Sequence, residues 1–229
     1  MRRQAISHAI NREEITDTIF KGTRTPAKEF SSPVLPGYND SIEGSENLEY
    51  DPEKAKELWA EADEINEFSS PSLEIAYNSD GGHKAWVDAV ANSIKNNLGI
   101  EVIGEPYPDF KSLRDEVTNR TITSAFRTGW QADYPSIGNF LAPLYYTGGS
   151  SNDGDYSNEE FDQRMDEAAT ADSSEEAQEK FNEAQEIILN DLPAIPLWYP
   201  NTTGGYSENV DNVTFSWKQQ PLYYEITKQ

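Results

Sequence analysis

The chain has 229 residues, a formal net charge of −23 at pH 7 and no cysteine. The missing cysteines exclude disulfides, thiolate metal sites and cysteine nucleophiles, and the negative charge argues against nucleic acid and anionic lipid as partners. No stretch approaches the roughly 18 apolar residues of a membrane span. The 5 Trp, 12 Tyr and 9 Phe residues predict a folded core rather than a disordered chain.

The N-terminal part of the chain carries two helical patterns and then a loop-like stretch. Apolar residues at helical spacing predict a helix over 3–10, and a capping box of Asn11 and Glu14 predicts a second helix that runs to about Phe20. Residues 22–50 are interrupted by proline and glycine. Because a long structureless loop is uncommon in a compact domain, we expect this stretch to pack along the domain or to line a site.

The middle of the chain has the pattern of an α/β domain. Asp51 followed by Pro52 predicts the start of a helix, with a side-chain cap and then proline at the first helical position. The apolar patterns that follow predict strand, helix, strand, helix and strand over residues 72–78, 83–98, 100–103, 109–119 and 123–130. Short connections between such elements favour a sheet covered by helices.

The last part of the chain is helical and strongly acidic before it becomes polar and irregular. Between Asp155 and Asp191 there are 13 acidic and two basic residues, a composition typical of a solvated outer face. Helices are predicted over 137–145, from the Ser157–Glu160 capping box to about 171, and over about 174–190. Residues 194–199 predict a buried strand, and 201–229 contain short β-like pieces.

Motifs of enzymes and metal sites are sparse. The chain has two histidines, His8 and His83, and it lacks the HExxH, GxSxG, P-loop and GxGxxG patterns. The run Asn152–Asp155 lacks the ligand spacing of a calcium loop and predicts an exposed turn. An acidic α/β hydrolase that uses a carboxylate pair stays open as an alternative, because acids are abundant and no pair stands out.

The stretch from Arg127 to Pro135 carries the candidate binding residues. Asp133 follows a predicted strand end, where a carboxylate either holds an ammonium group or caps the helix after Pro135. In a continuous strand Arg127 shares a face with Asp133, so that its guanidinium either binds the other end of the same ligand or pairs with a nearby acid. Trp130 and Tyr134 offer flat walls to a ligand or belong to the core.

Three segments together resemble one protein family. They are Arg3–Arg12 (RQAISHAINR), Gly129–Pro135 (GWQADYP) and Ala194–Tyr199 (AIPLWY). In this order they resemble the peptide/nickel-type (family 5) extracellular solute-binding proteins of ABC importers. The resemblance implies an α/β lobe of a type II periplasmic-binding-protein-like fold, with a mixed sheet and flanking helices. Residues 1–200 would form the second lobe, and residues 201–229 would return to a first lobe that is missing from this chain.

The resemblance also implies a function without catalysis, metal or cofactor. Such receptors capture a short peptide between two hinged lobes and deliver it to an ABC permease in the membrane. The acid at the position of Asp133 would hold the α-ammonium group, and the arginine at the position of Arg127 would meet the C-terminus of a short peptide. Trp130 and Tyr134 would line the pocket. A nickel chelate, haem or a sugar is the alternative ligand.

An extracytoplasmic location follows from the same resemblance, in the periplasm or as a cell-surface lipoprotein. The first residues of the chain lack the apolar stretch and the cleavage site of a signal peptide. We expect this of a piece taken from the middle of a longer exported protein.

Overall fold

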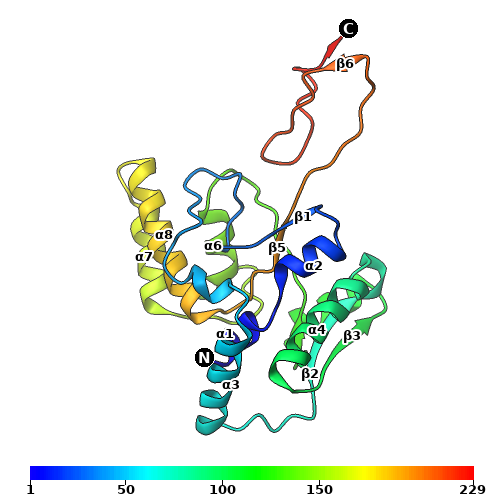
Figure 1. Ribbon diagram of the computed structural model, residues 1–229. Coiled ribbons are helices and arrows are strands. Elements are labelled where there is room, and N and C mark those ends of the chain that lie inside the picture. The colour runs from blue at the N-terminus through cyan, green and yellow to red at the C-terminus, as the bar shows by residue number, and fades with distance from the viewer.

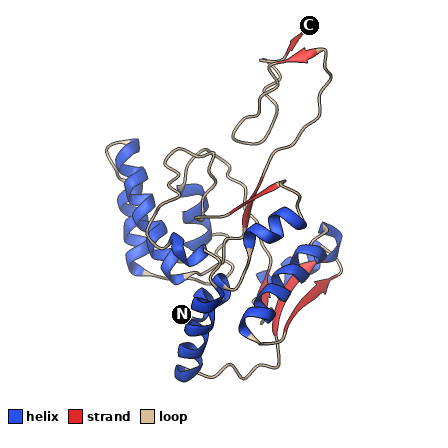
Figure 2. Cartoon of the chain, viewed as in Figure 1, coloured by secondary structure: helices blue, strands red, loops and turns tan.

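The computed structural model describes residues 1–229, which form a body of helices and short strands and an extended C-terminal tail (Figure 1, Figure 2). The helices are α1 (Arg2–His8), α2 (Arg12–Thr18), α3 (Pro52–Ile65), α4 (Lys84–Leu98), α5 (Phe110–Thr118), α6 (Gly138–Tyr145), α7 (Glu159–Ala169) and α8 (Ser174–Asp191). The strands are β1 (Arg24–Pro26), β2 (Leu73–Asn78), β3 (Val102–Tyr107), β4 (Ala125–Phe126), β5 (Trp198–Pro200), β6 (Val210–Asp211) and β7 (Thr227–Lys228). No helix has the length and apolar character needed to cross a membrane.

The main sheet confirms the predicted alternation of strands and helices and the α/β class. Its order is β3-β2-β4 and both pairings are parallel, with Leu73 opposite Val102 and Ile75 opposite Ala125. A second, antiparallel pair is formed by β1 and β5. The chain leaves β2 for β3 on one side and then returns to β4 on the other side. The carboxyl ends of β2 and β4 therefore flank a topological switch point, where ligands bind in open α/β sheets.

The third strand of this sheet is shorter than predicted. The apolar pattern predicts residues 123–130, whereas β4 has two residues. The backbone N–H of Arg127 still donates to Ala76 O at 2.9 Å, but the ladder between β2 and β4 ends at the Ala76–Phe126 pair, before β2 itself ends at Asn78. The expectation that Arg127 and Asp133 share the face of one continuous strand is therefore wrong.

A first hydrophobic core lies where α1, α2, α3 and α4 pack with the sheet. Its buried members include Ala9, Ile10, Ala55, Val87, Val90 and Ile94. Side chains of α4 also hold the end of α1, because Ser93 Oγ and Asn97 Nδ2 donate to Ala9 O at 2.8 and 2.9 Å. These contacts fix α4, and with it the start of α4 next to the sheet edge.

Arg12 is a buried cation that connects three segments of this core. Its guanidinium donates to the carbonyl oxygens of Ser7, Leu48 and Pro196 at 3.1, 2.7 and 2.9 Å. No acidic side chain pairs with it, and burial lowers the pKa of Arg12. A buried charge is tolerated when such hydrogen bonds replace water. Arg12 therefore ties α1 to the loop before α3 and to the chain that enters β5.

A second hydrophobic core is built by α6, α7, α8 and the long loop between β1 and α3. Its members include Phe30, Ile42, Leu48, Leu141, Phe161 and Ile188. The loop lies directly on α8, where Gly44 has φ +88° and an added Cβ would sit 2.8 Å from Leu189 Cβ. The structure thus confirms that the loop-like stretch packs along the domain.

Residues 201–229 leave the body after β5 and extend away from it (Figure 1). Within this tail, β6 and β7 form a two-stranded antiparallel pair. The tail meets the body in a few places: Asn201 Nδ2 donates to Gly22 O at 3.0 Å, and Gln131 Nε2 donates to Lys218 O at 3.4 Å. The tail is therefore folded mainly on itself.

Candidate ligand-binding site

Polar side chains gather at the switch point, where β2 and β4 end. Asn78 is the last residue of β2 and is buried. Its Oδ1 accepts from Arg127 Nη1 at 2.8 Å, and its Nδ2 donates to Asp80 Oδ1 at 2.6 Å. A single buried amide therefore orients both a cation and an anion at the edge of the sheet.

Arg127 stands at this edge without a carboxylate partner. Its guanidinium lies 5.9 Å from the ring centroid of Phe110 and is bound by the amide of Asn78, so the alternative of a simple ion pair is not what the structure has. Burial lowers the pKa of Arg127, and the charge of Asp80 opposes that shift. The remaining donors can bind an anion.

Asp133 and Tyr134 lie on the turn between β4 and α6. Both are exposed, and the Asp133 carboxylate makes no hydrogen bond or ion pair within the chain. The helix that follows has Ile137 at its N-cap and no side-chain cap, so Asp133 does not cap it. The carboxylate is consequently free to hold a cationic group of a ligand.

Asn139 of α6 holds this turn by hydrogen bonds. It is buried, and its Oδ1 accepts from the backbone N–H of Asp133 at 2.9 Å and from Trp130 Nε1 at 3.3 Å. Asn139 thus brings Trp130 and Asp133 into one unit. No hydrogen bond or ion pair joins this unit to Arg127. A polar residue inside an apolar helical stretch was the signal in the sequence that could have identified Asn139 as a site residue.

His83 is a second residue of this region whose place in the site was not predicted; the sequence indicated only a possible helix start there. It precedes α4, half-buried, and its Nδ1 lies 3.0 Å from Trp86 Nε1, which donates to it. Burial lowers the pKa of His83 and the charge of Arg127 adds to this, while Asp80 opposes it. Its position after the carboxyl end of β2 was the signal in the sequence for a site residue, because the carboxyl ends of parallel strands lie along one edge of the sheet, where ligands bind.

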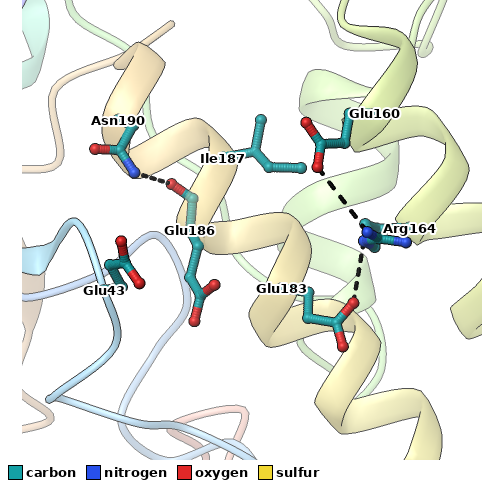
Figure 3. Close-up of a pocket in the computed structure, with 7 residues that line it drawn as sticks. All are labelled: Glu43, Glu160, Arg164, Glu183, Glu186, Ile187 and Asn190. Atoms are coloured by element: carbon teal, nitrogen blue, oxygen red, sulfur yellow. Dashed lines mark hydrogen bonds and ion pairs between the residues drawn. The ribbon is translucent and has the colours of Figure 1, made fainter.

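The acidic face of α7 and α8 contains a shallow hollow, which is a weaker candidate for a ligand-binding site (Figure 3). Glu160 and Glu183 both reach Arg164, at 3.9 and 3.0 Å. Burial raises the pKa of Glu186, as do the charges of Glu43 and Glu183. Two of the four acids that line the hollow thus pair with Arg164 on an open surface, as expected of a solvated face.

The run Asn152–Asp155 is an ion-paired turn and holds no metal cluster. Asp153 Oδ2 lies 2.5 Å from Arg114 Nη1, and Asp155 Oδ1 lies 2.8 Å from Arg120 Nη2. No group of three or more potential metal-ligating side chains is present in the chain. Arg114 and Arg120 thus occupy the carboxylates that a calcium ion would need as ligands.

Comparison with known proteins identifies the family. The family model described as bacterial extracellular solute-binding proteins, family 5, middle part, matches residues 2–152. The oligopeptide-binding protein OppA of Bacillus subtilis is 25% identical over 215 residues, which cover 92% of this chain and 39% of that protein. The heme-binding protein A of Haemophilus influenzae is 29% identical over 198 residues, which cover 85% and 35%. The chain thus spans between about a third and two-fifths of these relatives.

Solved structures show the same likeness. A crystal structure described as a peptide-binding protein of a peptide ABC transporter has a TM-score of 0.74 and 27% identity, and covers 86% of this chain and 89% of that one. The DppA protein of Helicobacter pylori in complex with the peptide STSA has a TM-score of 0.77 and 25% identity, over 99% of this chain and 43% of that one.

Proposed function

Because the chain belongs to the bacterial extracellular solute-binding proteins of family 5, we propose that it forms the second lobe of a receptor that captures short peptides for an ABC importer. Members of this family are binding components of transport systems rather than enzymes. Arg127 carries the proposal: its half-buried guanidinium at the switch point is held by an amide and keeps donors free for an anion.

Asp133 and Arg127 would bind the two ends of a peptide. The exposed, unpaired carboxylate of Asp133 would accept hydrogen bonds from the α-ammonium group, and the fork of Arg127 would bind the C-terminal carboxylate of a short peptide. Trp130, oriented by Asn139, and the exposed ring of Tyr134 would form walls for the peptide between them.

The body would act as one half of a hinged pair of lobes. Residues 1–200 would be the second lobe, and residues 201–229 would return to a first lobe that this chain does not contain. A ligand that touches both lobes stabilises the closed state by its higher affinity for that state. The closed receptor would then dock on a membrane permease outside the cytoplasm, as a periplasmic protein or a cell-surface lipoprotein.

Calorimetric titration of the two-lobed protein with a tripeptide, its N-acetylated form and its C-amidated form tests the assignment of the two ends. In the unaltered protein, each blocked peptide should bind roughly 10- to 100-fold more weakly, since each loses a charge-assisted hydrogen bond. Asp133→Asn should remove the difference between free and N-acetylated peptide. Arg127→Lys keeps the charge but loses the fork, and should reduce the penalty of C-amidation.

Asp172→Asn is the matched control, because it removes one exposed acid in the connection between α7 and α8, far along the chain from the turn. It should leave all three affinities unchanged. Equal losses in Asp133→Asn and Asp172→Asn would show a general charge effect and end the ammonium assignment. Binding of haem, a nickel chelate or a sugar without any peptide binding would leave the family membership intact and reject the peptide ligand.

A further inference from the structure

Trp86 donates its indole N–H to a side chain of the candidate site. The donor Nε1 lies 3.0 Å from His83 Nδ1, and the two rings meet edge to face with centroids 5.7 Å apart. Trp86 is buried in the first core, and Trp198 of β5 packs against it edge to face at 5.2 Å. The direction of the indole N–H is therefore set by core packing and not by the solvent-facing site.

This hydrogen bond decides where the imidazole proton resides. A ring nitrogen that accepts must carry a lone pair, so a neutral His83 has its proton on Nε2. That nitrogen lies against the loop after β2: a Cβ added to Gly81 would be 2.3 Å from His83 Nε2 and 2.7 Å from Asn78 Nδ2. Gly81 thus permits the imidazole to sit beside the same Asn78 that holds Arg127.

We propose that Trp86 is a positioning residue that keeps His83 neutral with its proton on Nε2, so that the site offers an uncharged ring donor beside the cation of Arg127. That a ligand uses this donor rests on the proposed function, whereas the protonation state does not. A ligand carboxylate would then meet one positive charge and a separate neutral donor, and its binding would not require protonation of His83.

The charged groups around the ring agree with a neutral imidazole. The charges that act on the pKa of His83 are those of Arg127, which directly follows β4, and Asp80, which lies in the loop after β2. Lys84, the next residue in α4, is occupied by Asp88 at 2.6 Å. Burial lowers the pKa of His83, Arg127 lowers it further, and Asp80 only partly opposes them. Trp86 adds to this preference, since its N–H can bond only to the unprotonated Nδ1.

The other histidine provides an internal comparison. His8 Nδ1 lies 2.9 Å from the carbonyl oxygen of Glu49. A carbonyl oxygen can only accept, so His8 carries its proton on Nδ1. The two histidines of the chain are thus expected to be opposite tautomers.

Nitrogen-15 NMR of the full chain with labelled histidine and tryptophan tests the proposal without any ligand. We expect a protonated Nε2 in His83, a protonated Nδ1 in His8, and an indole signal of Trp86 that titrates with the midpoint of His83. Trp86→Phe should raise the pKa of His83 by about half a pH unit to one pH unit, since it removes a hydrogen bond to the neutral form. Trp198→Phe disturbs the same core but leaves the indole donor, and should leave that pKa within a few tenths of a unit.

A protonated Nδ1 in His83 overturns the proposal. An indole signal of Trp86 that does not change as His83 titrates overturns it as well. Both readouts come from the unaltered chain, so they decide the matter even if Trp86→Phe fails to fold. Equal pKa changes in Trp86→Phe and Trp198→Phe would also reject the role of the indole donor. If the expected tautomers are found but no peptide binds the two-lobed protein, the proposed function fails and the role of Trp86 stands.

Discussion

Glu29 is a buried acid outside the candidate site. Its carboxylate accepts from Ser31 Oγ at 2.5 Å and from Gln185 Nε2 at 3.0 Å. The Oε1 atom of Gln185 is buried without a hydrogen-bond partner. Burial raises the pKa of Glu29 to about 7, and the nearby charge of Asp40 contributes in the same direction. At this position the loop between β1 and α3 is held on α8 by a carboxyl group that is mostly protonated below about pH 7.

We therefore predict that Glu29 makes the protein less stable as the pH rises. Between about pH 4.5 and pH 7 the folded chain holds a proton on Glu29 that the unfolded chain has lost, so the free energy of unfolding falls through this window. The loss is complete above pH 7 and amounts to at most about 3 kcal/mol. Glu29→Gln should remove this loss, because its amide is neutral and can donate to Gln185 Oε1. Urea denaturation of both proteins at pH 5 and pH 8 measures the difference.

Glu49→Gln is the control for this experiment, because Glu49 is exposed in the same loop region. It removes the same charge without removing a buried carboxylate. Its stability should follow that of the unaltered protein at both pH values. A gain in Glu29→Gln that is equal at pH 5 and pH 8 would contradict the raised pKa.

The turn between β4 and α6 is the element that presents Asp133 and Trp130. We predict that Asn139→Leu lowers the free energy of unfolding by about 1–3 kcal/mol, because it leaves the Asp133 N–H and the Trp130 indole N–H without their acceptor. Peptide affinity of the two-lobed protein should fall as well. Asn139→Asp keeps an acceptor oxygen and should retain more of both. Equal loss in the two variants would mean that the acceptor is not what shapes the turn.

The loop between α6 and α7 is fastened to α5 by ion pairs. Arg114 binds Asp153 with both guanidinium Nη atoms, at 2.5 and 3.3 Å, in a half-buried position. We predict that Asp153→Ala costs about 1–2 kcal/mol of stability. Asp155→Ala, at a more exposed pair, should cost less than about 1 kcal/mol. Thermal unfolding checks both variants.

The same loop gives a prediction about metal. Since arginines occupy the carboxylates of Asp153 and Asp155, neither calcium nor EDTA should change the melting temperature. A rise with calcium that Asp153→Ala abolishes would show that a cation displaces Arg114.

At the scale of the whole molecule, the body and the tail differ in how they are held. The body has two hydrophobic cores, whereas the tail contributes no residue to either. Three of its aromatic side chains are well exposed: Tyr206, Tyr223 and Tyr224. Such rings are typical of a surface that another part of a protein covers. This agrees with the proposal that residues 201–229 pack on a first lobe.

We predict that a chain ending at residue 200 folds with a free energy of unfolding within about 1 kcal/mol of the full chain, because the lost contacts are few and exposed. In the full chain, the amides of 201–229 should exchange with solvent much faster than those of α4 and α8. Urea denaturation and hydrogen exchange measure these two effects. Unfolding of the shortened chain would show that the tail belongs to the body and would contradict a boundary near residue 200.

Local signals in the sequence were sufficient for most elements. Helical spacing and capping residues predicted α2, α3 and α8, and the Asn11 cap accepts from the Glu14 N–H as expected. One cap was displaced: Asn158 rather than Ser157 caps α7, since its Oδ1 reaches two backbone N–H groups. Strand ends were less well predicted. β3 continues to Tyr107 because it pairs with β2 along its whole length. The sequence did not indicate this end, because Glu105 and Pro106 interrupt the apolar pattern.

The sequence alone determined the α/β class, the family resemblance and the candidates Arg127, Trp130, Asp133 and Tyr134, because these depend on local order along the chain. Only the tertiary structure decided which side chains meet. Asn78 lies 49 positions before Arg127, and the two touch because the sheet places β2 beside β4. The bond from Trp86 to His83 and the support of Asp133 by Asn139 likewise depend on side-chain direction. Periodicity reports which residues are buried, but their neighbours are set by strand order and core packing.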